Sequence, residues 1–204
     1  MPSPIIFLIS APSGVGKTTV CQGLLAAQTG LQRVVTCTTR APRPGEVAGV
    51  DYHFLDPDDF ARRVGQGEFL EHAEVYGRRY GTLKSEVRSR LEAGFDVLLN
   101  IDVQGAASVR SAAAADPVLA AALVTVFYTT ASQTEMESRL RGRAADSEEV
   151  IQRRLAEARV EAARWREFDY LVLSGSREED LRRMRVIFEA EKLRRHRSTF
   201  EFGA

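Results

Sequence analysis

The sequence predicts an α/β fold in which helices cover both faces of a parallel sheet. Short apolar runs bounded by turns alternate along the chain with longer segments of helical periodicity. The runs are nearly continuous and rich in valine and isoleucine, as in parallel strands that are buried on both faces. The predicted strands occupy residues 5–10, 34–38, 97–101, 124–128 and 170–173.

The segments between and after these strands have helical patterns. Several begin at residues that commonly cap helices, namely Ser132, Asp146 or Ser147, and Ser176. We interpret the alanine run 112–115 and the following Asp116-Pro117 as a helix end and not as a linker. The predicted helices occupy residues 18–27, 57–65, 85–93, 104–114, 133–141, 147–168 and 177–195.

Two segments interrupt this alternation. Residues 39–82 are rich in Arg, Gly, Pro, Glu and Tyr and show short alternating stretches, which are typical of an inserted, partly β subdomain. Residues 139–154 carry several arginines around a polar hinge and indicate a mobile loop that can deliver charge. Within this loop we expect Arg141 and Arg153 to pair with nearby glutamates along solvated helices.

Length and composition limit the classes of protein. A chain of 204 residues can form one unit with a substantial core. Basic and acidic residues number 28 each, so the net charge of zero does not favour nucleic acid or membrane partners. Cys21 and Cys37 lie in apolar runs without metal-ligand spacing, and we expect two small buried side chains. With no signal-peptide features and no membrane-spanning run, the chain is predicted to be cytoplasmic.

Residues 5–19, IIFLISAPSGVGKTT, combine a predicted strand with a phosphate-binding loop. The loop fits the end of the pattern G-x4-G-K-[ST], with Ala11 in place of its first glycine. Its glycines let backbone N–H groups surround phosphate oxygens, and the following helix directs its positive end toward them. Lys17 can reach the β- and γ-phosphates of ATP or GTP, and the Thr18 hydroxyl can ligate Mg²⁺. The predicted nucleotide-binding residues are Ala11, Pro12, Ser13, Gly14, Val15, Gly16, Lys17, Thr18 and Thr19.

Arg40 and Arg43 indicate a second anion site. They lie three residues apart on a backbone restricted by proline, which holds both guanidinium groups on one side. Paired arginines form charge-assisted hydrogen bonds to phosphate, and the phenols of Tyr52 and Tyr80 can donate to the same oxygens. The alternative for this segment alone is a solvated surface turn.

Six segments match a known family, and their order and spacing together are highly specific: SAPSGVGKTT, TTRAPRPGE, GVDYHF, FLEHAEVYGRRYGT, IDVQGA and RLRGR-x-x-DSEEVIQRRL. In them the chain resembles guanylate kinases over essentially its full length. The resemblance implies a P-loop kinase core with a parallel sheet (residues 1–35, 86–137 and 156–204), an inserted mixed α/β subdomain that binds GMP (36–85) and a helical lid (138–155). It implies transfer of the γ-phosphate of ATP to GMP, and in our interpretation to dGMP, with Mg²⁺ as cofactor.

By position, the resemblance also implies individual site residues. Those holding the GMP phosphate would be Arg40, Arg43, Tyr52 and Tyr80, and those around guanine would be Thr36, Glu71, Thr82 and Asp102. The catalytic residues would be Lys17, Arg40 and the lid arginines Arg139, Arg143 and Arg154. Guanine chemistry agrees, because its N1–H and N2–H₂ need a carboxylate such as Glu71, while its O6 needs donors such as the threonine hydroxyls.

Three departures from the family pattern leave details open. Asp102 can contact either guanine or a metal-bound water. Two positions before it, Asn100 stands where the family usually has a second acid. Ala144 stands in the lid hinge where glycine is common, and Ser174-Gly175-Ser176 replaces an Asn-Asp pair near the ATP adenine. The oligomeric state cannot be inferred.

Other functions fit the sequence less well. A related binding module without catalysis would have a degraded phosphate loop, whereas Gly16, Lys17 and Thr18 are present here. A sugar-phosphate kinase would lack the guanine pocket, and a P-loop GTPase would show an N-K-x-D run after its later strands. The basic residues 192–197 fit a solvated helix face better than a nucleic-acid site.

Overall fold

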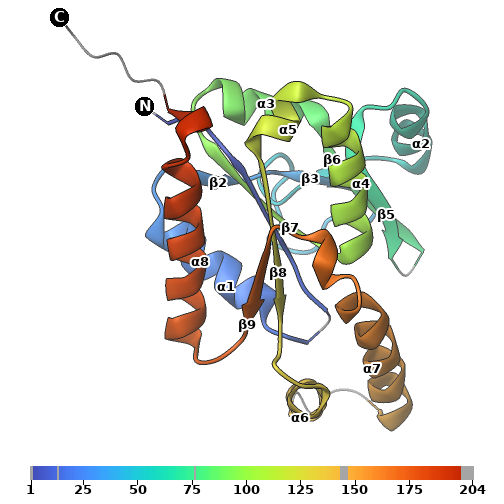
Figure 1. Cartoon of the computed structure of the whole chain (residues 1–204). Helices are drawn as coiled ribbons and strands as arrows, with labels where there is room; N and C mark the ends of the chain where they lie inside the picture. The colour runs from blue at the N-terminus through green and yellow to red at the C-terminus, as the bar shows by residue number, and fades with distance from the viewer. Residues whose placement is uncertain (1, 13, 76, 143–146, 199–204) are drawn as a thin grey trace, which may run out of the picture.

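A five-stranded parallel sheet forms the core of the protein (Figure 1), with strand order β2-β7-β1-β8-β9. The computed structural model describes residues 2–12, 14–75, 77–142 and 147–198. The strands are Ile6–Ser10 (β1), Leu31–Arg33 (β2), Asp96–Ile101 (β7), Leu123–Thr129 (β8) and Tyr170–Leu173 (β9). The predicted α/β fold with a parallel sheet is therefore confirmed.

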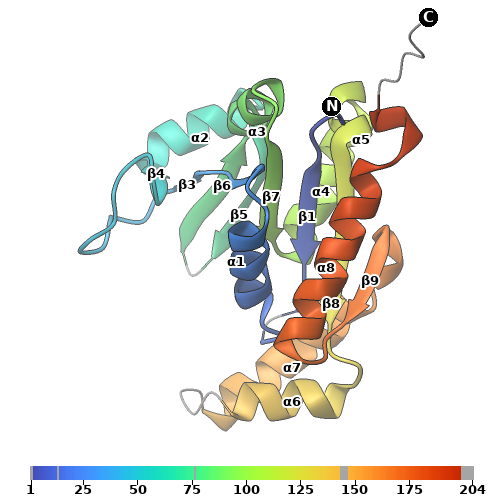
Figure 2. The same cartoon turned by 90° about the vertical axis from the view of Figure 1, so that its left-hand side faces the viewer.

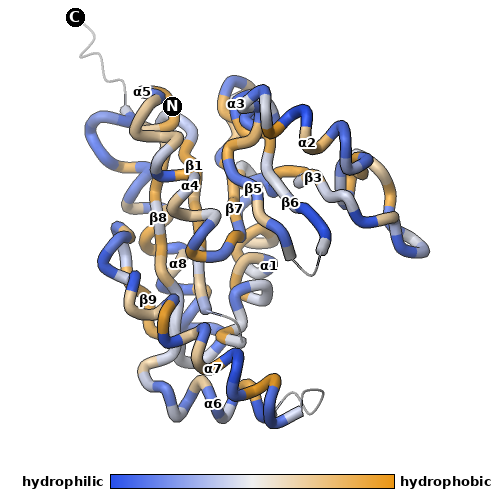
Figure 3. Tube along the Cα trace, turned by 90° about the vertical axis from the view of Figure 1, so that its right-hand side faces the viewer, coloured by the Kyte–Doolittle hydropathy of each residue, from blue (hydrophilic) through white to orange (hydrophobic). Residues whose placement is uncertain are grey.

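Helices cover both faces of this sheet, which explains why its central strand is buried throughout. Phe7 and Ile9 pack toward α1 (Lys17–Ala27) and α8 (Arg177–Lys192), while Ile6 and Leu8 pack on the opposite face. That opposite face is covered by α3 (Lys84–Glu92), α4 (Val103–Ala114) and α5 (Pro117–Ala122). Figure 3 shows the resulting concentration of hydrophobic residues along the core strands. The two-sided burial is the arrangement expected for parallel strands.

A second, mixed sheet lies beside the core (Figure 2) and has the order β4-β3-β6-β5. Its elements are Thr36–Thr38 (β3), Tyr52–Phe54 (β4), Pro57–Gly65 (α2), Phe69–Val75 (β5) and Arg78–Leu83 (β6). A small hydrophobic cluster of Cys37, Phe60, Phe69 and Leu83 stabilises it, and β5 contacts α4 of the core. The expected inserted, partly β element is confirmed.

Two helices, α6 (Gln133–Arg141) and α7 (Glu148–Ala162), lie together at the end of the core sheet that carries the phosphate-binding loop (Figure 2). Leu140, Ile151 and Leu155 attach them to the core cluster. Arg141 pairs with Glu137 on its own helix and with Glu148 at the start of α7, as expected for this arginine. This exposed ion pair lowers the pKa of Glu148 to about 2, mainly through its hydrogen bonds to Arg141.

Several predicted boundaries are wrong. The run 34–38 is not one core strand, because β2 ends at Arg33 and Thr36–Thr38 belongs to the second sheet. The predicted helix 147–168 ends at Ala162 and is followed by a short 3₁₀ helix, Trp165–Glu167 (η1). Helix α8 ends at Lys192, before a second 3₁₀ helix, Arg195–Arg197 (η2). An apolar run alone does not record where the chain leaves one sheet for another.

Helix α5 was not predicted, although its start signal is in the sequence. Asp116 caps this helix by accepting hydrogen bonds from the N–H groups of Val118 and Leu119, and Pro117 follows at its first position. The predicted caps Ser132, Ser147 and Ser176 are confirmed, and Asp146 lies outside the described residues. Within the described part of the chain, no helix is both long and apolar enough to cross a membrane.

Candidate active site

The phosphate-binding loop leaves the carboxyl end of β1 and leads into α1. Gly14 and Gly16 adopt φ values of +96° and +103°, a left-handed conformation that only glycine adopts readily. Leu140 of α6 packs closely against Gly14. A Cβ added to this glycine would lie 2.5 Å from Leu140 Cδ2, so a larger residue would clash there. The glycines therefore serve the backbone path, and one of them also lets α6 approach the loop. Ser13 lies outside the described residues.

Lys17, the first residue of α1, donates a hydrogen bond from Nζ to the carbonyl oxygen of Ile101 over 2.6 Å. Burial lowers the pKa of Lys17, while the nearby carboxylates of Asp102 and Glu161 act in the opposite direction. These two acids and Thr18 help line a cavity of about 320 Å³ over the loop. The lysine thus faces an open, anion-sized space from the positive end of α1.

Two acidic residues lie near the loop: Glu161, which was not predicted from the sequence, and Asp102, for which the sequence left two possible contacts open. Glu161 reaches the loop cavity from α7, and no motif relates it to the loop. Asp102 caps α4, with its Oδ1 accepting the Gly105 N–H over 2.7 Å. A Cβ on Gly105 would lie 3.3 Å from Asp102 Oδ1 and 3.4 Å from Glu71 Oε2, so both carboxylates approach this glycine. Asp102 therefore lies between the phosphate loop and Glu71.

Glu71 is a buried carboxylate on β5, with 7 % of the residue exposed. The Thr82 hydroxyl donates to Glu71 Oε1 over 2.6 Å, because the two residues are opposite each other in the antiparallel pairing of β5 and β6. Burial raises the pKa of Glu71, and the neighbouring charge of Asp102 raises it further. A buried carboxylate whose pKa is raised by the loss of its hydration is typical of binding and catalytic sites.

Arg40, Tyr52 and Tyr80 come together at the other end of the second sheet. The Arg40 guanidinium lies 5.4 Å from the centre of the Tyr52 ring, and the two tyrosine rings are 6.2 Å apart. Glu46, which was not among the predicted residues, accepts two hydrogen bonds from Arg40, at 2.8 and 3.0 Å, and raises its pKa. Arg43 is exposed, and its backbone N–H donates to Glu46.

A cavity of about 350 Å³ runs between the phosphate loop and the second sheet. Its lining includes Thr18 from α1 together with Thr36, Tyr52 and Thr82 from the second sheet. Thr18 also lines the cavity over the loop, so the two spaces meet at this residue. The structure thus brings Thr36, Tyr52 and Thr82 of the predicted second site to a region continuous with the loop cavity, whereas Arg40, Arg43, Glu71 and Tyr80 do not line it.

Of the predicted lid arginines, Arg139 is held in place most clearly. Its NH1 donates to the Val15 carbonyl of the loop at 2.9 Å and to Ser174 Oγ at 2.8 Å, and its NH2 donates to Glu135 at 2.6 Å. Arg154 is half-buried on α7, and Arg143 lies outside the described residues. Arg139 therefore connects α6, the loop and the end of β9.

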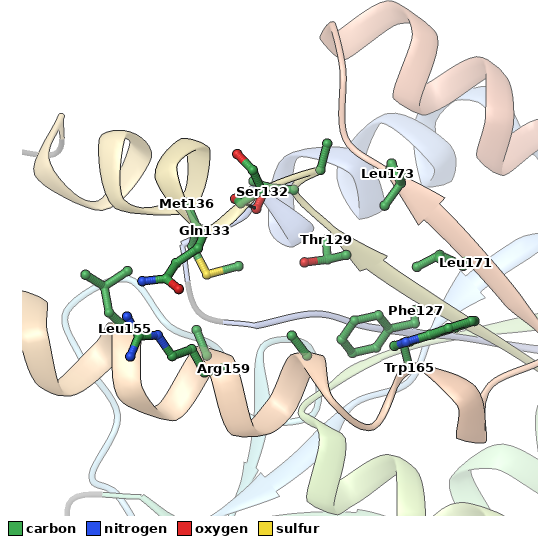
Figure 4. Close-up of a pocket in the computed structure, with 14 residues that line it drawn as sticks. Phe127, Thr129, Ser132, Gln133, Met136, Leu155, Arg159, Trp165, Leu171 and Leu173 are labelled. Carbon is green, nitrogen blue, oxygen red and sulfur yellow. Dashed lines mark hydrogen bonds between the residues drawn. The ribbon is translucent and has the colours of Figure 1, made fainter.

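Another hollow, of about 290 Å³, lies between α6, α7 and the edge strand β9 (Figure 4). Its lining includes the apolar side chains of Phe127, Leu155, Trp165, Leu171 and Leu173, and none of the predicted site residues lines it. Among the described residues, no group of three or more His, Cys, Asp or Glu side chains could hold a metal ion.

A phosphate-binding loop at the end of the central parallel strand, facing an inserted sheet with a second anion-binding arginine, defines the class of P-loop kinases. The family model "Guanylate kinase" matches residues 3–191. The guanylate kinase of Paramagnetospirillum magneticum is 43 % identical over 193 residues, which cover 95 % of this chain and 87 % of that protein. The chain belongs to the guanylate kinase family.

Two further comparisons agree. The guanylate kinase of Methylobacillus flagellatus is 42 % identical over 197 residues, covering 97 % of this chain and 94 % of that protein. The crystal structure of guanylate kinase from Anaplasma phagocytophilum superposes with a TM-score of 0.72 at 30 % identity, covering 97 % of this chain and 90 % of that one. The similarity therefore extends over both sheets.

Proposed function

We propose that this chain transfers the γ-phosphate of ATP to GMP, giving ADP and GDP, and that it also accepts dGMP. The observation that carries the proposal is the buried Glu71–Thr82 pair, because Thr82 donates to Glu71 and lines the cavity that meets the phosphate-loop cavity at Thr18. Family membership gives the class of reaction, phosphorylation of a nucleotide at the expense of ATP.

The second sheet, with residues 36–85, is the proposed GMP-binding subdomain. Its buried carboxylate at Glu71 would accept the N1–H and N2–H₂ of guanine, while the hydroxyls of Thr36 and Thr82 would serve O6. Arg40, Arg43, Tyr52 and Tyr80 would hold the phosphate. The bidentate hydrogen bonding of Arg40 to Glu46 supports this role. Two oxygens of a phosphate can accept the two N–H groups of a guanidinium in the same way as the two oxygens of a carboxylate. GMP would then displace Glu46.

The phosphate loop is the proposed ATP site, with Lys17 and the loop amides around the β- and γ-phosphates. The oxygen donors around the loop suit Mg²⁺, since Thr18 and the carboxylates of Asp102 and Glu161 line one cavity. Thr18 would be the direct ligand, and Asp102 would contact guanine or a water on the metal. When bound, Mg²⁺ would neutralise charge that develops on the transferred phosphoryl group.

Transfer itself needs positioning and charge neutralisation more than covalent chemistry. Lys17, Arg40, Arg139, Arg143 and Arg154 would supply positive charge to the phosphoryl group, with residues 138–155 acting as a lid that excludes water. No general base is required, because the attacking phosphate oxygen of GMP is already anionic near neutral pH. The core would comprise residues 1–35, 86–137 and 156–204.

A cytoplasmic location is proposed on the cysteines alone. Both Cys21 and Cys37 are free and buried, and burial raises the pKa of each thiol to about 11. Thiols in this state are small apolar side chains with little reactivity, which suits a reducing compartment.

The proposal is tested by a coupled assay of ADP release with Mg²⁺-ATP and each of GMP, dGMP, AMP, CMP and UMP. We expect rapid turnover with GMP, turnover with dGMP, and rates at least about a hundredfold lower with the other acceptors, because a site built for guanine leaves its polar groups unpaired with them. Absence of turnover with GMP, or equal rates with AMP, would show that the proposed function is wrong.

The affinity for GMP should fall as the solution becomes more acidic. Glu71 accepts hydrogen bonds from guanine only when ionised, and its pKa is raised above the ordinary value of 4.5. GMP binding is therefore complete above the raised pKa and is lost as the pH falls through it. The measurement is KM for GMP from pH 8 to pH 4.5, in the wild type and in Glu71→Gln. Because the GMP phosphate titrates near pH 6 in both proteins, only the difference between the two profiles reports Glu71, and identical profiles would contradict the assignment.

A further inference from the structure

A buried carboxylate on α8 occupies the far side of the phosphate loop from the GMP subdomain. Asp180 is 3 % exposed and lies in the first turn of α8. Its Oδ2 accepts the hydroxyl protons of Tyr128 at 2.6 Å and of Ser174 at 2.9 Å, and its Oδ1 accepts the Gly175 N–H at 2.8 Å. Three donors thus satisfy a carboxylate that no sequence motif marks as functional.

The hydroxyl of Ser174 connects this carboxylate to Arg139. Asp180 can only accept, so the Ser174 hydroxyl can donate to it, while the same hydroxyl lies 2.8 Å from Tyr128 OH in a contact where either oxygen can be the donor. In each arrangement a lone pair of Ser174 Oγ is left for Arg139 NH1, which donates to it at 2.8 Å and to Val15 in the phosphate loop at 2.9 Å. The chain of contacts from α8 to the loop is therefore continuous.

The position of the guanidinium depends on both of its ends. Glu135, one turn earlier on α6, holds NH2, while Ser174 and Val15 share NH1. Three of the five N–H groups are thereby used by described protein groups. Without Ser174 oriented by Asp180, the contact of Glu135 alone would leave a long side chain with several rotamers.

From this arrangement we propose that Asp180 is a positioning residue for ATP, acting through Ser174 to hold Arg139 against the phosphate loop. The inference rests on the proposed function and adds to it a residue on α8 that contacts neither substrate. It requires that Asp180 affect ATP and not GMP, since the second sheet lies on the opposite side of the loop from β8 and β9.

The molecule contains a matched control for burial and polarity. Glu191, on the same helix, is 2 % exposed and accepts a hydrogen bond from the hydroxyl of Tyr170. This pair also joins a tyrosine of the core sheet to an acid of α8, but it lies at the other end of the helix and has no contact with Arg139 among the described residues. Tyr128→Phe and Tyr170→Phe therefore each remove a tyrosine hydroxyl bound to a buried acid of α8, one inside the proposed chain of contacts and one outside it, where Arg194 and Arg197 also hold Glu191.

The experiment measures the Kd of Mg²⁺-ATP by titration calorimetry, together with KM for ATP and for GMP. For Asp180→Asn we expect Kd and KM for ATP to rise about tenfold, the size of one lost charge-assisted hydrogen bond, with KM for GMP unchanged. Tyr128→Phe should raise the values for ATP by about threefold, and Tyr170→Phe should leave them unchanged. Because ATP binding is measured without an acceptor, the proposal can be tested even if GMP is not a substrate.

A double-mutant cycle distinguishes positioning from general destabilisation. In an Arg139→Ala background, Asp180→Asn should cause no further rise in the Kd of ATP, because the group that it positions is absent. The same rise in both backgrounds, an equal rise in KM for both substrates, or no rise at all would each overturn the proposal. If urea unfolding shows that Asp180→Asn does not fold, Tyr128→Phe and Ser174→Ala carry the same cycle and the same criteria.

Discussion

Replacing Lys17 with alanine is expected to lower kcat about a thousandfold with GMP and with every other acceptor. The ammonium group faces the loop cavity from the start of α1, and within the described part of the chain it donates a hydrogen bond to the Ile101 carbonyl. It is therefore available to the β- and γ-phosphates, where charge develops during transfer. Removing one such preorganised electrostatic contact costs about 10²–10³ in rate, and the loss of a full charge belongs at the upper end.

Lys84 provides the control for this prediction. Its ammonium group also donates to a backbone carbonyl, that of Gly67 at 2.7 Å, but it lies outside both cavities. Lys84→Ala should retain wild-type kcat, whereas Lys17→Ala should retain only the affinity for GMP, measured by calorimetry. If Lys17→Ala kept more than about a tenth of the wild-type kcat, which is a barrier change of only about 1.4 kcal/mol, the lysine would not have the proposed role.

Replacing Glu71 with alanine is expected to remove most of the preference for GMP over AMP. The carboxylate is buried and hydrogen-bonded to Thr82, so it can discriminate between bases by pairing with guanine and remaining unpaired with adenine. Sites of this type reject the wrong ligand by about 10⁴ or more when intact. We expect the ratio of kcat/KM for GMP to that for AMP to fall by at least about 10², mainly through a loss of activity with GMP.

Glu74 on the same strand is the matched control, because it is exposed, whereas Glu71 is buried and hydrogen-bonded to Thr82. Glu74→Ala should keep the wild-type ratio. Glu71→Ala should remain folded, since removing a buried carboxylate also removes the cost of its desolvation, and Glu74→Ala should remain folded because its side chain is exposed. An unchanged preference in Glu71→Ala would mean that guanine is read elsewhere, and the assignment of the second sheet as its binding site would then fail.

The parts of the fold that depend on local sequence could be predicted. The apolar runs identified β1, β7 and β8, which are largely buried on both faces, and also β9, whose Leu171 and Leu173 are exposed at the sheet edge. Serines at helix starts identified the caps of α6, α7 and α8. The division of residues 31–38 between two sheets could not be predicted. Val34 is buried in the core although β2 ends at Arg33. The apolar run therefore extends past the end of this strand, and the sequence does not show where the chain leaves the core sheet for the second sheet.

The candidate site shows the same division. Lys17, Thr18 and Arg40 were predicted because each belongs to a motif whose chemistry is local, whereas Glu71 was predicted by position from the resemblance to guanylate kinases. Glu46, Glu161 and Asp180 were not predicted, since each becomes relevant only through a contact made in the folded protein. Glu161 reaches the loop cavity from α7, and Asp180 reaches Arg139 only through Ser174.

By itself, the sequence determined that a phosphate-binding loop pattern follows an apolar strand and that a pair of arginines follows it, while the guanine-reading role of Glu71 came from the family resemblance and stays a prediction. These conclusions depend on backbone conformation, charge and hydrogen-bonding capacity, which are properties of residue types at short spacing. Only the tertiary structure decided that the two cavities meet at Thr18, that Arg40 donates hydrogen bonds to Glu46, and that α8 is linked to the loop through Ser174 and Arg139. Such contacts join residues far apart in the chain, and only packing of the whole fold brings them together.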